Sequence, residues 1–566
     1  MSATTATTPP GSRRRGGGLL TALAALLCAL ASPVTTTAAP AAALAAADRS
    51  GPVVRTDHGP VRGAAHGSYA TFDGVPYAAP PVGRLRWRPP APAAAWQGVR
   101  DATTTAPRCV QMPAPGTAAG AVSGSEDCLY LNVTMPTPAR PAAGRPVLVW
   151  LHGGAFLGGS GSDYDAQRLA VRGGAVVVTV NYRLGVFGYF GHPGLGAAPP
   201  FGLADQQAAL RWVRANAERF GGAPDRVTLV GESAGALGIC AHLTSPTAAG
   251  LFQRAVLQSG SCSMSFPRGA LGPGSPAYEP FAAQRDVQSA GVQAARRLGC
   301  TAERDEEVVA CLRGQGTDRL ATAELMQSFN RPAYGNALLP MAPQEALEAG
   351  RFHRVPLLQG TNRDEMRLFV GLSLAAFPIR TEDEYRARLT DAFGSTAAAV
   401  EAQYPAAGHP TPALAWAALL TDRSLTCTTL AAGRTIAAHA PGLPLHGYEF
   451  GAPQPPVPAG LPQDPGFPYG AAHGFELPFL FSSVATERPL DEAERVLSDR
   501  MVDYWTAFAR TGSPDVPGAP PWPALRSAGP RDQPVQSLAA GPGGIRPVDA
   551  DSAHHCPFWD GVGRAG

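Results

Sequence analysis

Apolar residues in this chain occur in short runs separated by stretches with helical spacing. The runs at 147–151 and 175–180 contain mostly Val, Leu, Ala and Trp. Continuous apolar runs of this length are typical of strands buried on both faces of a sheet. Between 203 and 220 the apolar positions recur with helical spacing, and Gly221-Gly222 is a suitable helix stop. The alternation predicts an α/β fold with a large, mostly parallel central sheet flanked by helices.

A further strand-like run, 227–230, leads directly into Gly231-Glu232-Ser233-Ala234-Gly235, and a helical pattern follows at 236–243. A G-x-S-x-G sequence between a strand and a helix is the nucleophile elbow of the α/β-hydrolase fold. Its sharp turn holds the serine hydroxyl out at the edge of the sheet, which requires small neighbours. The pattern predicts that Ser233 is a nucleophile. The alternative, an ordinary glycine-rich turn, leaves the strand-turn-helix context unexplained.

A serine hydroxyl is a poor nucleophile and needs a base, an orienting acid and an oxyanion hole. His152-Gly153-Gly154-Ala155 follows the strand that ends at 151, so its glycine amides are candidates for the hole. The amide of Ala234, directly after the nucleophile, is the usual second contributor. We therefore predict an oxyanion hole formed by Gly153, Gly154 and Ala234.

The base should lie downstream, because this fold orders its residues as Ser, acid and His. His473 stands in a turn after the Pro-rich segment 453–468, which we interpret as a surface loop. His446 lies within a strand-like run and is interpreted as structural, whereas His554 and His555 are interpreted as surface residues near the C-terminus. The residues alone favour His473 without excluding the others.

Motifs along most of the chain resemble the type-B carboxylesterases, the family that includes cholinesterases, bile-salt-activated lipases and bacterial nitrobenzyl-ester esterases. The resemblance extends from about residue 53 to residue 559. Its motifs are Phe72-Asp73-Gly74-Val75-Pro76-Tyr77-Ala78, Pro80-Pro81-Val82-Gly83, Glu126-Asp127-Cys128-Leu129-Tyr130-Leu131-Asn132-Val133, the His152 loop, Asn181-Tyr182-Arg183, Phe220-Gly221-Gly222, the elbow and Leu257-Gln258-Ser259-Gly260-Ser261.

The resemblance implies the remaining parts of the site. The family's acid is a glutamate in an Asp-Glu pair just past a strand, which corresponds to Glu365, with Asp364 as the local alternative. The family's histidine corresponds to His473, and Ser259 resembles a serine that lies beside the catalytic residues. Neither a cofactor nor a metal is implied. The family would make residues 48–566 a single α/β-hydrolase domain.

Two positions depart from the family pattern. Met366 stands after the glutamate, where the family usually has Gly, and could reshape that loop. Ala223 replaces an Asp that normally follows the two glycines, so a buried polar contact is lost or moves to Asp225.

The N-terminus predicts export. Residues 13–15 are arginines, and an apolar run at 19–30 is too short for a permanent membrane anchor. We interpret 1–47 as a signal peptide and low-complexity leader, with the Sec and Tat routes both open. Cys28 lacks the small residues of a lipoprotein box, and no later segment is long and apolar enough to span a bilayer. The sequence therefore predicts a secreted protein without a stable membrane anchor.

Nine cysteines are present, and loss of Cys28 with the signal leaves eight, an even number that indicates disulfides in an exported chain. Counting cannot assign the pairs. The family resemblance implies Cys109–Cys128, Cys300–Cys311 and Cys427–Cys556. Cys240 and Cys262 remain, and either a fourth bond or two buried free thiols fits them.

Net charge is +2, and no basic run follows the N-terminus, so the sequence predicts no nucleic-acid partner. The resemblance implies a small-molecule ester substrate. Cholinesterases hold a choline-binding Trp inside the first disulfide loop, but no aromatic residue lies between Cys109 and Cys128, so choline esters are not predicted. A lipase or polyester hydrolase and a non-catalytic relative are the alternatives. The unperturbed pKa of the base, His473, would be ~6.5, so kcat/KM is expected to fall below roughly neutral pH. The oligomeric state is not predicted.

Overall fold

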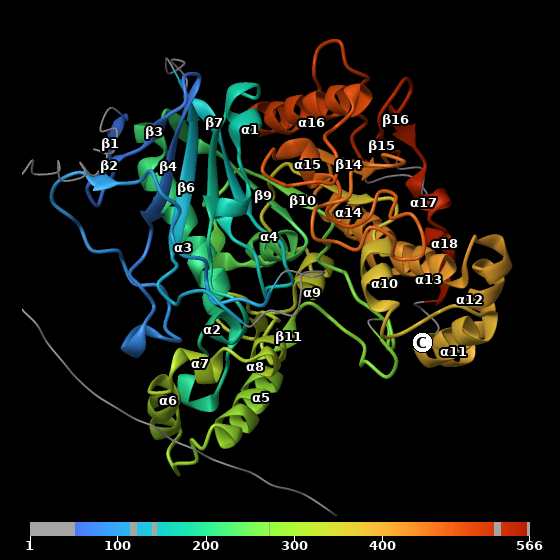
Figure 1. The fold of residues 1–566 in the computed structure, drawn as a ribbon, viewed down its shortest axis with the longest axis horizontal. Helices are drawn as coiled ribbons and strands as arrows, with labels where there is room; N and C mark the ends of the chain where they lie inside the picture. The colour runs from blue at the N-terminus through green and yellow to red at the C-terminus, as the bar shows by residue number, and fades with distance from the viewer. Residues whose placement is uncertain (1–50, 114–121, 138–143, 271, 526–533, 563–566) are drawn as a thin grey trace, which may run out of the picture. The chain divides into compact units, whose positions relative to one another are not determined.

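One large sheet organises the protein. The computed structural model describes residues 51–113, 122–137, 144–270, 272–525 and 534–562. Within these ranges an 11-stranded sheet runs in the order β16-β15-β14-β13-β10-β9-β7-β8-β6-β4-β3 (Figure 1). The strands from β8 to β15 are parallel, and β16, β6, β4 and β3 add antiparallel pairs at the two edges. The predicted mostly parallel sheet is thereby confirmed.

The strands of this sheet are short to medium in length. Their bounds are β3 Ala64–Ala65, β4 Tyr69–Pro76, β6 Tyr130–Pro136, β7 Arg145–Leu151, β8 Val176–Val180, β9 Gly222–Glu232, β10 Arg254–Gln258, β13 Leu357–Asn362, β14 Leu445–Phe450, β15 Val535–Leu538 and β16 Ile545–Val548. Two smaller sheets contain β1 Val53–Arg55, β2 Pro60–Arg62 and β5 Arg100–Asp101, and β11 Ala282–Ala283 with β12 Ala333–Tyr334.

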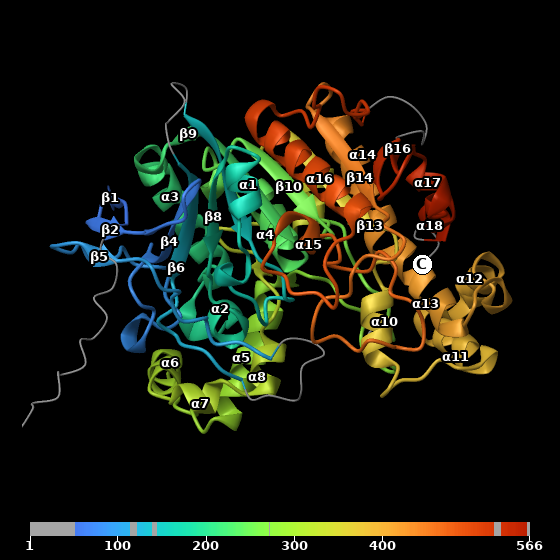
Figure 2. The same ribbon diagram turned by 45° about the horizontal axis from the view of Figure 1, so that its top comes forward.

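Helices cover both faces of the sheet. Their bounds are α1 Gln167–Val171, α2 Gly185–Tyr189, α3 Phe201–Asn216, α4 Ala234–Thr244, α5 Gln284–Arg297, α6 Asp305–Arg313, α7 Thr317–Leu320, α8 Ala323–Ser328, α9 Pro343–Glu348, α10 Arg367–Ser373, α11 Glu382–Phe393, α12 Ala397–Gln403, α13 Pro412–Thr421, α14 Cys427–His439, α15 Leu477–Leu480, α16 Glu492–Thr511, α17 Ala550–Ala553 and α18 Cys556–Val562. Figure 2 shows α1 and α16 side by side across the strands.

The continuous apolar runs are explained by this double cover. Side chains alternate between the two faces of a strand. In β7, Val147, Val149 and Leu151 join the core cluster that includes α3, α4 and α14. Leu148 and Trp150 join the other cluster, which includes α1 and α16. Because both faces are buried, nearly every position of the central strands is apolar.

The loops that carry the candidate residues leave the sheet at one edge. The loop of Gly153 follows β7, Ser233 follows β9, Glu365 follows β13, and the long segment that holds His473 follows β14. These four strands are parallel, so their carboxyl ends lie on the same side. In parallel α/β sheets, ligands bind outside the carboxyl ends of the strands.

Four disulfides are present among the described residues: Cys109–Cys128, Cys240–Cys262, Cys300–Cys311 and Cys427–Cys556. The Cys240–Cys262 pair, left open by the sequence, is therefore bonded in the structure. It joins α4, which follows the elbow, to the segment after β10. The bond Cys427–Cys556 joins the first residues of α14 and α18 across 129 positions of sequence. The interpreted leader, residues 1–47, lies outside the described residues.

The interpretation of His554 as a surface residue is wrong. It is buried between two carboxylates, with Nδ1 2.6 Å from Asp422 Oδ1 and Nε2 2.6 Å from Glu449 Oε2. Asp422 begins a π-helical turn, Asp422–Thr426, and Glu449 lies on β14. Burial alone would lower the pKa of His554, but the hydrogen bonds and charges of Asp422 and Glu449 outweigh it and raise the pKa to about 10.

Replacing His554 by Gln should destabilise the fold by about 3–5 kcal/mol, because two buried carboxylates lose the cation between them. A raised pKa in the folded state gives stability that is complete below the unfolded pKa of ~6.5 and is lost as pH rises through the folded value. The wild type should therefore lose stability between about pH 6.5 and 10, and His554→Gln should lose less in that window. Urea unfolding at several pH values measures both. His555→Asn, at the neighbouring half-buried position, is the control, and equal stability of His554→Gln and wild type would contradict the prediction.

Candidate active site

The elbow places Ser233 in a strained turn between β9 and α4. Its φ is +54°, a left-handed value that residues other than glycine rarely adopt. Ser233 is partly exposed, whereas its four motif neighbours are buried. A Cβ on Gly235 would collide with the carbonyl oxygen of Leu151 at the end of β7, and one on Gly231 would lie 3.0 Å from the same oxygen. Both glycines are therefore needed for the turn to pass this close to β7.

The loop after β7 has an unusual backbone. Gly154, Ala155 and Phe156 all have positive φ, at 104°, 55° and 58°. The amides of Gly153 and Gly154 donate no hydrogen bond within the described ranges. A Cβ on Gly153 would collide with Glu232 Oε2 and lie 3.1 Å from Ser233 Cβ, so this loop packs directly against the elbow. Consecutive strained residues of this kind cluster at functional sites.

Glu365 and His473 are in direct contact. Glu365 Oε2 lies 2.6 Å from His473 Nδ1, and the His473 amide donates to the Glu365 carbonyl at 3.2 Å. The other carboxylate oxygen of Glu365 accepts from the Asn362 amide at 2.8 Å. Glu365 is fully buried. Both oxygens are thus held, and the carboxylate fixes the orientation of the imidazole ring.

Asp364, the local alternative, points elsewhere. Its Oδ2 accepts from the Ala471 amide at 2.9 Å, and its Oδ1 lies 2.7 Å from the Arg367 guanidinium. Its own amide donates to the Ala471 carbonyl at 2.9 Å. Asp364 therefore ties its loop to the segment that bears His473 without touching the imidazole.

The second ring nitrogen of His473 faces Glu232. Nε2 lies 3.1 Å from Glu232 Oε1, although the two atoms lack hydrogen-bond geometry. No hydrogen bond joins Nε2 to Ser233 Oγ in this structure. Because Glu232 directly precedes Ser233, the free end of the imidazole is directed at the elbow. Hydrogen bonds between catalytic groups are often long before substrate binds.

Electrostatics favour a proton on this histidine. Burial alone would lower the pKa of His473, but the charges of Glu232 and Glu365 and the hydrogen bond that Nδ1 donates to Glu365 raise it above its usual value. Burial raises the pKa of Glu232; the charge of His473 opposes that rise, and the nearby carboxylates of Glu476 and Glu365 add to it. The His473 pKa therefore lies above ~6.5, the unperturbed value for His.

Three polar residues that the sequence analysis missed connect these parts. The Gln258 carbonyl accepts from the Ser233 amide at 2.9 Å, and its Nε2 donates to Glu476 Oε1 at 3.0 Å. Asn362 Nδ2 donates to Glu476 Oε2 and to the Ala472 carbonyl, both at 2.7 Å. Glu476 follows His473 by three positions. This spacing places two side chains on the same side of a helical turn, so it could have indicated that Glu476 lies near His473. Gln258 lay within a quoted motif.

Ser259 lies in the segment after β10 that packs against the elbow. It has a φ of +51°, and its amide donates to the Gly360 carbonyl at 2.8 Å. Its Oγ is buried and has no hydrogen-bond partner within the described ranges. The next residue, Gly260, lies so close to the elbow that a Cβ there would approach the Ser233 carbonyl oxygen to 2.8 Å.

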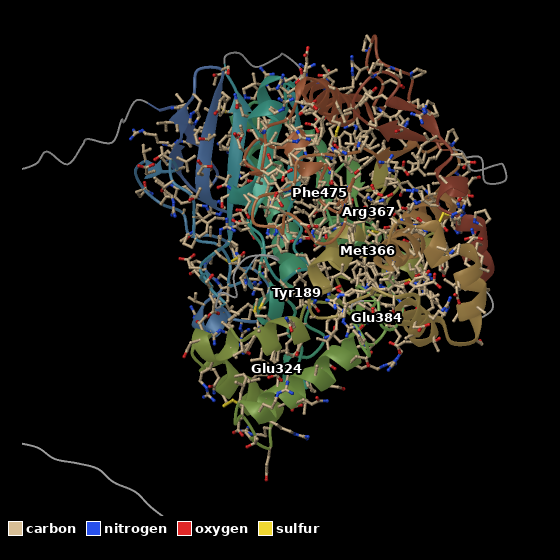
Figure 3. All side chains as sticks on the ribbon, turned by 45° about the vertical axis from the view of Figure 1, so that its right-hand side comes forward. Tyr189, Glu324, Met366, Arg367, Glu384 and Phe475 are labelled. Carbon is tan, nitrogen blue, oxygen red and sulfur yellow. A yellow bond between two sulfur atoms is a disulfide. The ribbon has the colours of Figure 1, made fainter. Side chains whose placement is uncertain are left out.

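The two departures from the family pattern are accommodated by the fold. Met366 has an ordinary helical φ of −79°, its side chain is buried in the core, and its amide donates to Thr421 Oγ1 at 3.0 Å. Figure 3 labels Met366 and Arg367 at the start of α10 and Phe475 on the neighbouring loop. Ala223 is buried at the start of β9, and Asp225 is exposed, so Asp225 does not replace the missing buried contact.

In the part of the chain that the structure describes, no group of three or more His, Cys, Asp and Glu side chains has the arrangement of a metal site. In the same ranges, no helix combines the length and apolar character needed to cross a bilayer.

The parallel sheet with helices on both faces and a serine elbow after β9 define an α/β hydrolase. Residues 50–559 match the family model described as the carboxylesterase family. The chain is 33% identical over 487 residues to the para-nitrobenzyl esterase of Bacillus subtilis, with 83% of this chain and 92% of the relative covered. It is 34% identical over 513 residues to the fumonisin B1 esterase of Sphingopyxis macrogoltabida, covering 84% and 85% of the two chains. It is 32% identical over 549 residues to the human cocaine esterase, covering 90% and 91%. The protein belongs to the type-B carboxylesterase family and is a carboxylic ester hydrolase.

Proposed function

We propose that the protein hydrolyses carboxylic esters through an acyl-enzyme on Ser233, with His473 as general base and Glu365 as its orienting acid. The observation that carries this proposal is the imidazole of His473. One of its nitrogens is held 2.6 Å from the buried Glu365 carboxylate, and the other is directed at the elbow. A serine nucleophile requires a histidine base with one ring nitrogen held by an acid and the other facing the serine hydroxyl.

In the first half of the reaction, His473 Nε2 takes the proton from Ser233 Oγ as the oxygen attacks the ester carbonyl carbon. The tetrahedral intermediate collapses, the C–O bond to the alcohol breaks, and Nε2 returns its proton to the leaving alkoxide. In the second half, water attacks the acyl-enzyme with Nε2 again as base, and the carboxylic acid is released. Glu365 stabilises the imidazolium at each stage.

The negative oxygen of each tetrahedral intermediate binds the amides of Gly153, Gly154 and Ala234. Gly153 and Gly154 carry free N–H groups, and Ala234 is the first residue of α4, where helical amides lack internal partners. The loop and the elbow are packed against each other, so the donors are positioned before substrate binds. Each such donor is worth about 10²–10³ in kcat.

The substrate class is an apolar small-molecule ester of broad type. The relatives are named as esterases of para-nitrobenzyl esters, fumonisin B1 and cocaine, so their names indicate different ester substrates within one family. Hydrolysis of nitrophenyl esters graded from acetate to palmitate tests the proposal. Turnover that peaks at short chains supports an esterase, and a peak at long chains supports the lipase alternative. No turnover of any ester would contradict the catalytic proposal.

We also infer that the mature protein acts outside the cytoplasm. Four disulfides are typical of proteins that fold in oxidising compartments, and the arginines and apolar run of residues 13–30 fit an export signal. N-terminal sequencing of protein recovered from culture medium tests this: a mature start between residues 30 and 50 is expected, and a start at Met1 would contradict it.

The pH dependence of kcat/KM should reflect the raised pKa of His473. Acylation needs the neutral imidazole, so activity should fall as pH drops through an apparent pKa above ~6.5. Glu232→Gln removes one of the charges that favour the imidazolium, and the apparent pKa should drop by about one unit. Full pH profiles of the two enzymes measure the shift. A loss of activity in Glu232→Gln with an unmoved profile would indicate a purely structural role.

A further inference from the structure

A cavity lies beside α3. Its volume is about 640 Å³, within the ~300–1,000 Å³ range of small-molecule sites. The lining residues are Asp57, His58, Tyr77, Pro89, Pro90, Ala91, Pro92, Pro199, Ala204, Gln207, Ala208, Arg211, Trp212, Ala215, Thr247, Ala337 and Leu338. None of them belongs to the proposed catalytic set.

Small residues on one helical face create this hollow. Ala204, Ala208 and Ala215 recur at helical spacing along α3, so the helix presents a shallow surface there. The facing wall is the segment 89–92, which contains three prolines. Proline has few conformations to lose, and the Ala91 carbonyl accepts from the Ala79 amide at 2.9 Å. The wall is therefore preformed and largely apolar.

Nearly all polar side chains of the cavity have internal partners. Asp57 accepts from Asn216 Nδ2 at 3.0 Å and contacts His58 Nδ1 at 2.7 Å. The Tyr77 hydroxyl donates to the Asn181 carbonyl at 2.7 Å. Gln207 binds Ser245 Oγ and accepts from the Thr247 hydroxyl. These groups are occupied and do not call for a ligand.

Two lining side chains are exceptions within the described ranges: the Trp212 indole N–H, which is buried without a hydrogen-bond partner, and the Arg211 guanidinium. Arg211 lies on the cavity face of α3 and is exposed, and it makes no hydrogen bond or ion pair with any residue in the described ranges. A guanidinium presents a planar fork of N–H donors that matches a carboxylate in a bidentate geometry. The cavity thus combines one free cation with an apolar wall.

We propose that this cavity binds an amphipathic carboxylate, with its carboxylate on Arg211 and its hydrocarbon part against the proline wall. Such acids are the acyl products of hydrolysis of apolar carboxylic esters, so the site would sense the product class of the enzyme. It is separate from the site of reaction. Gln207, which lines the cavity, binds Ser245, the residue directly after α4. Ser233 directly precedes the other end of this 11-residue helix, which is about 16 Å long.

Isothermal titration of the full-length protein with decanoate tests the proposal. Decanol has the same chain without the charge, and acetate has the charge without the chain. Decanoate should bind at least about tenfold more tightly than either. Wild-type protein whose Ser233 is blocked by a phosphonate ester should bind decanoate as the unblocked protein does, and loss of binding there would locate decanoate at the reaction site and overturn the proposal.

Matched variants test which side chains are responsible for decanoate binding. Arg211→Gln should weaken decanoate binding about tenfold. Arg214→Gln is the control, because Arg214 is exposed on the same helix with the same charge and does not line the cavity. Ala208→Trp should fill the hollow and abolish binding, and both arginine variants should keep wild-type kcat on a short nitrophenyl ester. Equal effects of the two arginine variants, or decanoate binding unchanged by Ala208→Trp, would overturn the proposal.

Discussion

Ser233→Ala should lower kcat by about 10⁶ while leaving the fold intact. The hydroxyl is the sole group proposed to form the acyl-enzyme, and its loss leaves only the oxyanion hole and substrate binding to assist water. Alanine keeps the Cβ, so the turn at φ +54° is no more strained than before. Steady-state hydrolysis of a nitrophenyl ester measures the loss, and equal urea midpoints establish that the variant is folded.

Labelling with a phosphonate ester gives an independent check on the same residue. Peptide mapping of the wild type should find the adduct on Ser233, and the alanine variant should stay unlabelled. Ser259 is a useful internal comparison, because it is also a serine with positive φ after a neighbouring strand, but its Oγ is buried. Substantial esterase activity in Ser233→Ala, or an adduct on another serine, would show that the nucleophile lies elsewhere.

Glu365→Gln should lower kcat by about 10⁴, comparable to the loss when the acid of a Ser-His-Asp triad is replaced by its amide. The uncharged glutamine side chain can no longer stabilise the imidazolium. Its NH₂ group can also donate to Nδ1 and so favour the wrong tautomer of His473. The contacts of Glu365 Oε1 with the Asn362 amide can persist, so the loop should keep its shape. Single-turnover acylation rates measure the effect directly.

Asp364→Asn is the matched control for this prediction. It makes the same chemical change one residue away, on a carboxylate that binds Ala471 and Arg367 instead of the imidazole. Its kcat should stay within about tenfold of wild type, with some loss of stability where the Arg367 pair is weakened. A reversed order of the two variants would assign the acid to Asp364.

Much of the fold was predictable because its signals are local. The run 147–151 lies within β7, the run 175–180 overlaps β8, and the helical pattern at 203–220 covers most of α3 and the 3-10 turn Ala217–Phe220 that follows it. Burial on both faces makes such strands continuously apolar, which is visible in the sequence. The strand, turn and helix around Ser233 are likewise consecutive in the chain, so the elbow could be predicted from one stretch of sequence.

The parts that were missed depend on contacts between distant segments. The partners of His554 lie 132 and 105 positions away, so nothing near it in sequence showed that it would be buried between carboxylates. The effect of the Glu232 charge on the His473 pKa depends on how two loops meet at the sheet edge, so the rise in that pKa could not be predicted from the sequence. The family resemblance supplied Glu365 and His473, but local sequence alone could not place them in contact.

The bond between Cys427 and Cys556 has a consequence for limited proteolysis. Any single cut between these two residues divides the polypeptide but releases neither fragment while the bond remains oxidised. The exposed positions around Gly460 and Asp464 lie within that interval, and so does His473. A nicked protein would migrate as one band without reductant and as two bands with it. His473 would stay tethered to the fragment that carries Ser233 and Glu365, so a two-chain form could retain all of the proposed reacting groups.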